Sequence, residues 1–170
     1  AKNYCDEFVI LDDASTDNSL KFVRNLSSKY PQLKILSHKS NVGFARNSND
    51  AVSMAQGDFV VLLNNDIVPQ KNYLQPSLRH FSNPKVMAVG FAEEGHPNYA
   101  RIFWKSGYLQ HEPGHSSKAH ISAWFSGGSS IVRKSIFKKL GGFDPIYAPF
   151  YSEDLDLGYR AWKSGYQILW

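Results

Sequence analysis

The chain has 170 residues, enough for one domain that buries its own core, and its 42% hydrophobic and 20% charged residues are ordinary for a soluble globular protein. The net charge of +4 is not gathered into Lys/Arg runs, which argues against a nucleic-acid-binding protein and suits a phosphate-bearing ligand or an anionic membrane surface. The single cysteine, Cys5, excludes an internal disulfide framework and favours a reducing compartment.

No segment of the sequence reads as a membrane span or as a signal peptide. The longest apolar run, residues 59–63, is far too short to cross a bilayer. We therefore expect a cytoplasmic protein that can associate peripherally with the inner face of the membrane.

Short apolar runs alternate with amphipathic stretches along the chain, which is typical of an α/β fold. The strand expected at residues 59–63 carries no charge and is expected at the centre of the sheet. Residues 91–119 read as a long variable loop containing one hairpin. In chain order we expect a strand at 8–11, a helix at 20–30, a strand at 34–36, a helix at 43–55, the uncharged strand at 59–63, a helix at 73–81, a strand at 86–89, ordered structure at 121–132, a helix at 135–140, a helix beginning at Ser152 and a strand from Gln167.

Two polar clusters follow directly after apolar strands. Asp12 and Asp13 end the first strand, and the triplet Asn64, Asn65 and Asp66 ends the strand at 59–63. Ligands of open α/β sheets lie outside the carboxyl ends of the strands, so both clusters are candidates for a binding crevice. The alternative is that both are ordinary turns, since Asn and Asp favour turns.

The first cluster lies in a recognisable motif. Residues 9–17 read V-I-L-D-D-A-S-T-D, which resembles the stretch V-V-D-[DN]-[GA]-S-[TS]-D of family 2 glycosyltransferases. The resemblance implies that Asp12 and Asp13 bind the nucleobase and ribose of a nucleotide sugar. A carboxylate can accept the imide N–H of uracil or thymine, so this role is chemically reasonable.

A second stretch, residues 41–47, is similar to a shortened N-x-G-x-x-x-A-R-N motif of that family. The resemblance implies that Asn41, Gly43, Arg46 and Asn47 border the donor. Backbone N–H groups at a helix start favour phosphate, and the guanidinium would add neutralising charge. The alternative for the arginine is a surface ion pair.

Residues 62–66, L-L-N-N-D, resemble the family's metal motif L-x-[DN]-x-D. The resemblance implies that Asp66, with Asn64, binds Mg²⁺ or Mn²⁺ through oxygen ligands, that the diphosphate completes the shell, and that Asn65 contacts the donor. Because Asn64 stands where the motif usually has a first Asp, we expect weak metal affinity in the absence of nucleotide.

Three further stretches, 125–134, 141–144 and 151–160, resemble the family's acceptor half, G-x-x-x-x-[VI]-[RK]-[RK], G-G-F-[DE] and [YF]-x-E-D-x-D-L-x-x-R. The resemblance implies that Asp154 is the catalytic base, with Glu153 as the second candidate. The positive end of the helix dipole should favour the ionised form of Asp154. The alternative is that both acids merely fill a first helical turn.

Two expectations concern side chains near this helix. Asp156 and Arg160 are four residues apart and should form an ion pair along the helix. Among the aromatic residues, Tyr151 beside the proposed base is the one expected to meet an acceptor sugar, whereas core packing is expected for Trp104, Tyr108, Trp124 and Phe150.

The resemblance covers residues 7–170 except the loop at 91–119, and it implies a single GT-A domain with a mainly parallel, mixed sheet. Residues 1–90 would form its nucleotide-sugar-binding half and residues 91–170 its acceptor-binding half. Members of the family open with a further strand and helix and continue past the last strand, so we expect a chain trimmed at both ends.

The activity implied is an inverting, metal-assisted transfer of a sugar from a UDP- or dTDP-sugar, dTDP-rhamnose being one candidate, to a hydroxyl of a saccharide or lipid-linked acceptor in polysaccharide biosynthesis. Two alternatives stay open. One is a sugar nucleotidyltransferase of the same fold, and the other is a non-catalytic fragment that binds nucleotide sugars.

Overall fold

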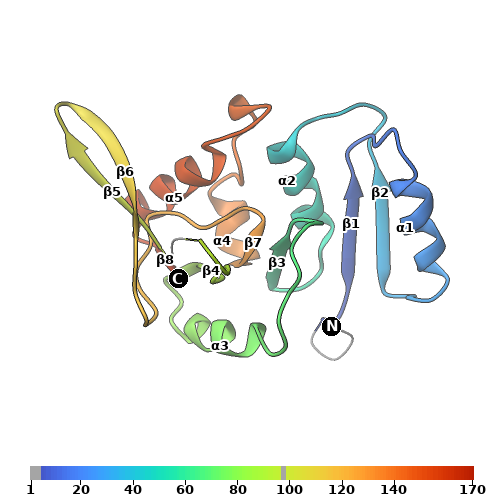
Figure 1. The fold of residues 1–170 in the computed structure, drawn as a ribbon, viewed down its shortest axis with the longest axis horizontal. Helices are drawn as coiled ribbons and strands as arrows, with labels where there is room; N and C mark the ends of the chain where they lie inside the picture. The colour runs from blue at the N-terminus through green and yellow to red at the C-terminus, as the bar shows by residue number, and fades with distance from the viewer. Residues whose placement is uncertain (1–4, 97–98) are drawn as a thin grey trace.

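The structure, a computed structural model, describes residues 5–96 and 99–170. Its helices and strands follow one another in α/β order (Figure 1). They are β1 Phe8–Asp12, α1 Ser19–Ser27, β2 Leu33–Ser37, α2 Phe44–Met54, β3 Phe59–Leu63, α3 Leu74–Leu78, the 3-10 turn η1 Arg79–Ser82, β4 Val86–Gly90, β5 Tyr99–Lys105, β6 Tyr108–Gly114, β7 Ser129–Arg133, α4 Lys134–Lys139, the 3-10 turn η2 Pro145–Tyr147, α5 Glu153–Lys163 and β8 Gln167–Leu169.

The strands form three sheets within the described residues. β1 pairs with β2 in parallel, β5 and β6 form an antiparallel hairpin, and the third sheet has the order β3-β7-β4-β8. In this third sheet β7 is antiparallel to β3 and β4, while β4 and β8 are parallel, so three of its four strands run in one direction. This arrangement confirms the mixed, mainly parallel α/β fold expected from the sequence.

The sheets and helices occupy distinct parts of the molecule. Figure 1 shows β1, β2 and α1 at one end and the β5–β6 hairpin projecting at the other, with the four-stranded sheet and α4 between them. The core lies around the four-stranded sheet, because an apolar strand must bury its faces against neighbouring elements. Its most deeply buried side chains are Val52, Met87, Ala88, Val132, Phe143, Leu157, Ala161 and Ile168.

The expectation that the 59–63 strand is central was wrong. β3 forms an edge of the four-stranded sheet, and its two end residues, Phe59 and Leu63, are exposed. The central strands are β4 and β7, in which every residue but the last is buried. An apolar run shows that a strand is suited to burial, but its place in the sheet depends on pairing with residues far away in the sequence.

Other boundaries differ in detail. The helix expected at 73–81 is divided into α3 and η1, and of the segment at 121–132 only the end is a strand, β7. The hairpin expected within 91–119 is present as β5 and β6. Trp104, Tyr108 and Phe150 are exposed rather than packed in the core. No helix in residues 5–96 and 99–170 is long and apolar enough to cross a membrane.

Candidate active site

The two aspartates that end β1 have different environments. Asp12 is buried, and it accepts hydrogen bonds from the Ser15 N–H at 3.3 Å and the Ser37 hydroxyl at 2.9 Å. These hydrogen bonds, chiefly those from Ser15, lower the pKa of Asp12, so its carboxylate is ionised at neutral pH. Asp13 instead accepts the backbone N–H groups of Val42 and Gly43 at 2.9 and 3.0 Å.

The Asp13 contacts change the phosphate site expected at the start of α2. The backbone N–H groups of Val42 and Gly43 already bind a carboxylate, so a phosphate here would have to use the amides of the first helical turn. Gly43 adopts φ +82°, a conformation that suits glycine, and precedes the helix. In that turn Arg46 is exposed, and the buried Oδ1 of Asn47 has no hydrogen-bond partner among the described residues.

Asn41, also assigned to the donor, lies in the loop before α2. It is exposed, and its Oδ1 accepts the Gly43 N–H at 3.2 Å. It therefore helps to shape the same turn that Asp13 holds.

The triplet after β3 is anchored at one end and open at the other. Asn64 donates its backbone N–H to the Gly128 carbonyl at 2.8 Å, and a Cβ built on Gly128 would lie 2.4 Å from the Asn64 carboxamide. Asn65 and Asp66 are exposed. The absence of a side chain at residue 128 is therefore what allows Asn64 to occupy its place.

These residues fit a hard divalent cation only in part. The Asp66 carboxylate makes no hydrogen bond or ion pair with the described residues, so its oxygens are available as ligands. No group of three His, Cys, Asp or Glu side chains that could hold a metal occurs in residues 5–96 and 99–170. A cation bound at Asp66 would thus have at most one further ligand of these types from the described residues.

Close packing joins α2 to the loop that precedes β7. The Phe44 ring, in the first turn of α2, lies so near Gly127 that a Cβ there would be 2.8 Å away. The same ring packs on Phe143 with 5.7 Å between ring centroids. Together with the Asn64–Gly128 contact, this packing brings the ends of β1 and β3, the start of α2 and the 126–128 loop into one contiguous region.

The G-G-F-D stretch at 141–144 is held from two sides. The Asn49 side chain donates to the Phe143 carbonyl at 2.7 Å and accepts the Phe143 N–H at 2.9 Å. From α5, Arg160 donates to the carbonyl oxygens of Leu140 and Gly142, and it also forms the expected ion pair with Asp156 at 2.6 Å. The contacts of Asn49 and the carbonyl contacts of Arg160 were not foreseen from the sequence.

The proposed base lies in the first turn of α5. Burial raises the pKa of Asp154 from its ordinary 3.8 to about 6 and outweighs the hydrogen bond from the Leu155 N–H, which lowers it, so the ionised form is not favoured as expected. Its Oδ1 accepts the Leu155 N–H at 2.8 Å, and Ser152 immediately before the helix has φ +89°. Glu153 is buried, and its Oε2 lacks a partner within the described residues.

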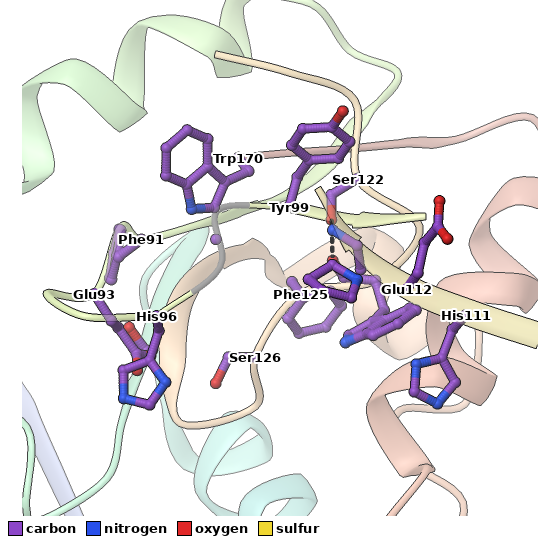
Figure 2. A pocket seen from close by; sticks show the side chains of 15 residues that line it. Phe91, Glu93, His96, Tyr99, His111, Glu112, Ser122, Phe125, Ser126 and Trp170 are labelled. Carbon is purple, nitrogen blue, oxygen red and sulfur yellow. Dashed lines mark hydrogen bonds between the residues drawn. The ribbon is translucent and has the colours of Figure 1, made fainter. Parts of the chain in front are cut away.

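A cavity of about 400 Å³ is lined by residues of the β5–β6 hairpin, of the segment at 122–129 and of the chain that follows β4. His111, which lines the cavity, packs edge-on against Trp124. Its coulombic effect lowers the pKa of Asp154, and it is the smallest of the causes that act on that carboxyl. Figure 2 shows Phe91, Glu93 and His96 on one side and Phe125, Glu112 and His111 on the other. None of these six residues was singled out from the sequence as a site residue. Phe125 begins the motif at 125–134, but the segments that carry the other five show no periodic pattern or motif.

Comparisons with known proteins agree with this arrangement. The sequence model of the family described as "Glycosyl transferase family 2" matches residues 2–141. EpsE of Bacillus subtilis (strain 168) is 26% identical over 168 residues, covering 95% of this chain and 58% of that protein. An N-acetylglucosaminyl-diphospho-decaprenol L-rhamnosyltransferase of Mycobacterium tuberculosis is 25% identical over 194 residues, covering 93% and 61%.

Among solved structures, GalNAc-T7 with UDP, GalNAc and Mn²⁺ superposes with a TM-score of 0.80 at 18% identity, covering 99% of this chain and 37% of that one. The chain thus spans about three fifths of the curated relatives named above. Because the family model matches most of the sequence and the fold agrees with that of GalNAc-T7, the chain belongs to glycosyl transferase family 2 and has the GT-A fold.

Proposed function

We propose that the chain transfers a sugar from a nucleotide diphosphate donor to an acceptor hydroxyl, with the donor on residues 1–90 and the acceptor on residues 91–170. The observation that carries this proposal is the contiguous region around Phe44 and Gly127, which brings together motifs that are far apart in the sequence. The family membership supports transfer to an acceptor over nucleotidyl transfer.

The donor side would bind the nucleotide through residues at the ends of β1 and β3. The ionised Asp12 carboxylate can accept the imide N–H of uracil or thymine, and Arg46 can neutralise phosphate. A UDP- or dTDP-sugar therefore suits the site. The UDP in the GalNAc-T7 structure supports UDP as the first nucleotide to test, and dTDP is the second because its thymine carries the same imide N–H.

A divalent cation would be held by Asp66, with Asn64 beside it, and when bound it would stabilise the negative charge on the departing diphosphate. The Mn²⁺ in the GalNAc-T7 structure supports a divalent cation. Because Asp66 offers one carboxylate and no cluster of His, Cys, Asp or Glu occurs in the part of the chain that the structure describes, the cation should bind well only together with the nucleotide.

On the acceptor side, Asp154 would take the proton from the acceptor hydroxyl as its oxygen attacks the anomeric carbon. The bond from that carbon to the diphosphate oxygen breaks, the nucleoside diphosphate leaves, and attack from the opposite face inverts the configuration. A pKa of about 6 suits a base that must be ionised near neutral pH and yet bind a proton during the reaction.

The experiment is a thermal-shift measurement of the 170-residue chain with UDP, dTDP and GDP, each with and without Mn²⁺. We expect UDP or dTDP to raise the melting temperature, and Mn²⁺ to add to the shift only when nucleotide is present. The variant Asp66→Asn should lose the contribution of Mn²⁺ and keep most of the nucleotide shift. Absence of a shift with all three nucleotides would contradict the proposal.

A second measurement separates transfer from binding alone. The chain is incubated for hours with the matching nucleotide sugars, with and without acceptor saccharides, and released UDP or dTDP is measured. If the chain binds UDP or dTDP but releases neither nucleotide from these sugars, it binds donors without turning them over.

A further inference from the structure

We propose that the tip of the β5–β6 hairpin, residues 104–109, binds an anionic membrane surface by inserting Trp104 and Tyr108 among the lipid headgroups. The inference goes beyond the proposed function and does not depend on it, because binding to lipid requires neither a donor nor an acceptor sugar. The partner is a bilayer that carries negatively charged headgroups.

The hairpin is fixed at its base and projects at its tip. At the base, the Ala100 N–H donates to the Ser122 hydroxyl at 2.9 Å, and the Ala123 N–H donates to the Ala100 carbonyl at 2.8 Å. At the tip, Ser106 and Gly107 join the two strands with φ +53° and +81°, the signs that a tight two-residue turn of a twisted ribbon requires. Figure 1 shows the hairpin projecting away from the four-stranded sheet, so its tip can reach a flat surface.

Large side chains are exposed on both faces of the tip. Trp104 is 69% exposed and lies opposite Leu109 in the ribbon. Tyr108 is 73% exposed and lies opposite Lys105. Successive residues of a strand point to opposite faces, so these two cross-strand pairs occupy different faces of the ribbon.

This two-sided exposure distinguishes a lipid layer from a protein partner. A protein, including a second copy of this chain, would cover one face of the ribbon and leave the aromatic ring of the other face in water. The headgroup layer of a bilayer can surround both faces at once. Trp and Tyr are also the residues enriched at that depth, because each joins an apolar ring to a polar N–H or O–H.

The charge of the hairpin complements anionic lipid. Lys105 at the tip is exposed, and Lys118 is exposed in the loop that follows the hairpin. Glu112 is the only acidic residue in the sequence from 99 to 121, and it is paired with Arg101 at 3.0 Å. No carboxylate at the tip therefore repels phosphate, and the Lys105 ammonium can meet headgroups while its aliphatic stem stays in apolar surroundings.

The test is co-sedimentation of the 170-residue chain with vesicles of phosphatidylcholine that contain about 30% phosphatidylglycerol, at low ionic strength. We expect binding to these vesicles. Binding should be at least about fivefold weaker to vesicles of phosphatidylcholine alone, and also in about 0.5 M salt, because the attraction of Lys105 is then absent or screened.

Variants locate the contact. Trp104→Ser and Tyr108→Ser should each weaken binding to the anionic vesicles by at least about fivefold, since each removes an interfacial ring. Phe22→Ser is the matched control and should change binding by less than about twofold. Phe22 is 65% exposed and lies on α1, at the other end of the molecule from the hairpin (Figure 1).

A charge variant has its own control. Lys105→Gln should weaken binding by about fivefold, whereas Lys21→Gln, which makes the same change of net charge at an exposed position of α1, should leave it within about twofold.

Fluorescence reports the depth of the tip. Vesicles that contain brominated phosphatidylcholine should quench the emission of Trp104. Trp104→Phe keeps an aromatic ring, so this variant should retain most of the binding and lose most of the quenching, because the other three tryptophans of the chain lie outside the tip.

Failure of the folded chain to bind anionic vesicles, a loss of binding in Phe22→Ser as large as in Trp104→Ser, or quenching that survives Trp104→Phe would overturn the inference. So would sedimentation velocity without vesicles that shows a dimer which Trp104→Ser dissociates, because the occupant of the tip would then be a second copy. Nucleotide-dependent melting tests the proposed function separately, and its outcome leaves this inference unchanged.

Discussion

Asp154 is subject to two opposing influences, burial that disfavours its charge and a hydrogen bond from the Leu155 N–H that favours it. Burial is the larger, and the pKa of Asp154 rises to about 6. Such a group is a base near neutral pH and an acid at only slightly lower pH. Two predictions at the residue scale follow from this position.

The first concerns turnover. Asp154→Asn keeps the shape of the side chain but cannot accept the proton, so turnover should fall by at least about a hundredfold while nucleotide affinity is unchanged. In the wild type, turnover should rise with pH through about 6 and level off above it, because the base must be ionised. Steady-state rates and nucleotide binding across pH 5 to 9 provide the measurement. If Glu153→Gln is the inactive variant and Asp154→Asn is not, the base is Glu153.

The second concerns stability. The folded pKa of Asp154 lies above its unfolded value, so its ionised form opposes folding, and wild-type stability should fall as pH rises from 3.8 to about 6. Asp154→Asn should therefore stabilise the protein by roughly 1 to 3 kcal/mol at pH 8 and by less than about 1 kcal/mol at pH 4. Urea unfolding at the two pH values measures this difference. If Asp154→Asn raised the free energy of unfolding equally at both pH values, the charge of Asp154 would not be the source of the added stability.

At the scale of the elements, the crevice depends on contacts between loops and helices. Gly128 precedes β7 and leaves room for the Asn64 side chain at the end of β3. Gly128→Ala should displace Asn64 and weaken Mn²⁺-dependent nucleotide binding by about tenfold or more, since a Cβ cannot lie 2.4 Å from that side chain. Calorimetry with nucleotide and Mn²⁺ provides the measurement.

Gly90→Ala is the matched control for that variant. Its Cβ would meet nothing nearer than 3.8 Å, so the substitution should leave nucleotide affinity unchanged. Equal affinities for the wild type and Gly128→Ala would show that Asn64 has no part in the site.

Asn49 on α2 makes two hydrogen bonds to the backbone of Phe143, which leads into η2 and α5. Asn49→Ala leaves both Phe143 groups without these partners and should lower the free energy of unfolding by about 1 to 3 kcal/mol. Ser53→Ala, at an exposed position of the same helix, should change it by less than about 0.5 kcal/mol. Denaturant unfolding of the two variants makes the comparison.

At the scale of the whole molecule, the order of the elements and the fold class could be predicted from the sequence, because alternating apolar runs and helical periodicity are local signals. The strand Phe59–Leu63 was predicted with its observed bounds, yet its place at an edge was not, because its only partner among the described residues is β7, far along the chain. Asn49 was missed for the same reason, since its partner is 94 residues away.

The sequence marks candidate site residues where a motif is present and marks none where the chain is irregular. Asp12, Asp13 and Asp154 were identified by motif, but their hydrogen bonds and the burial of Asp154 depend on the folded surroundings. The roles assigned to these residues stay predictions. The lining of the cavity comes mainly from the hairpin and the loop at 121–129, where the sequence has no periodic pattern.

The hydrogen bonds between Asn49 and Phe143 also bear on how the protein opens. The amide proton of Phe143 is bound to a side chain from the first half of the chain, so it can exchange with deuterium only after this hydrogen bond opens. Its exchange rate therefore reports how often this contact between residues 1–90 and 91–170 breaks, without any label or substrate. The donor and acceptor sites proposed above lie on these two halves, so ligands that hold the halves together should slow the exchange of that one amide.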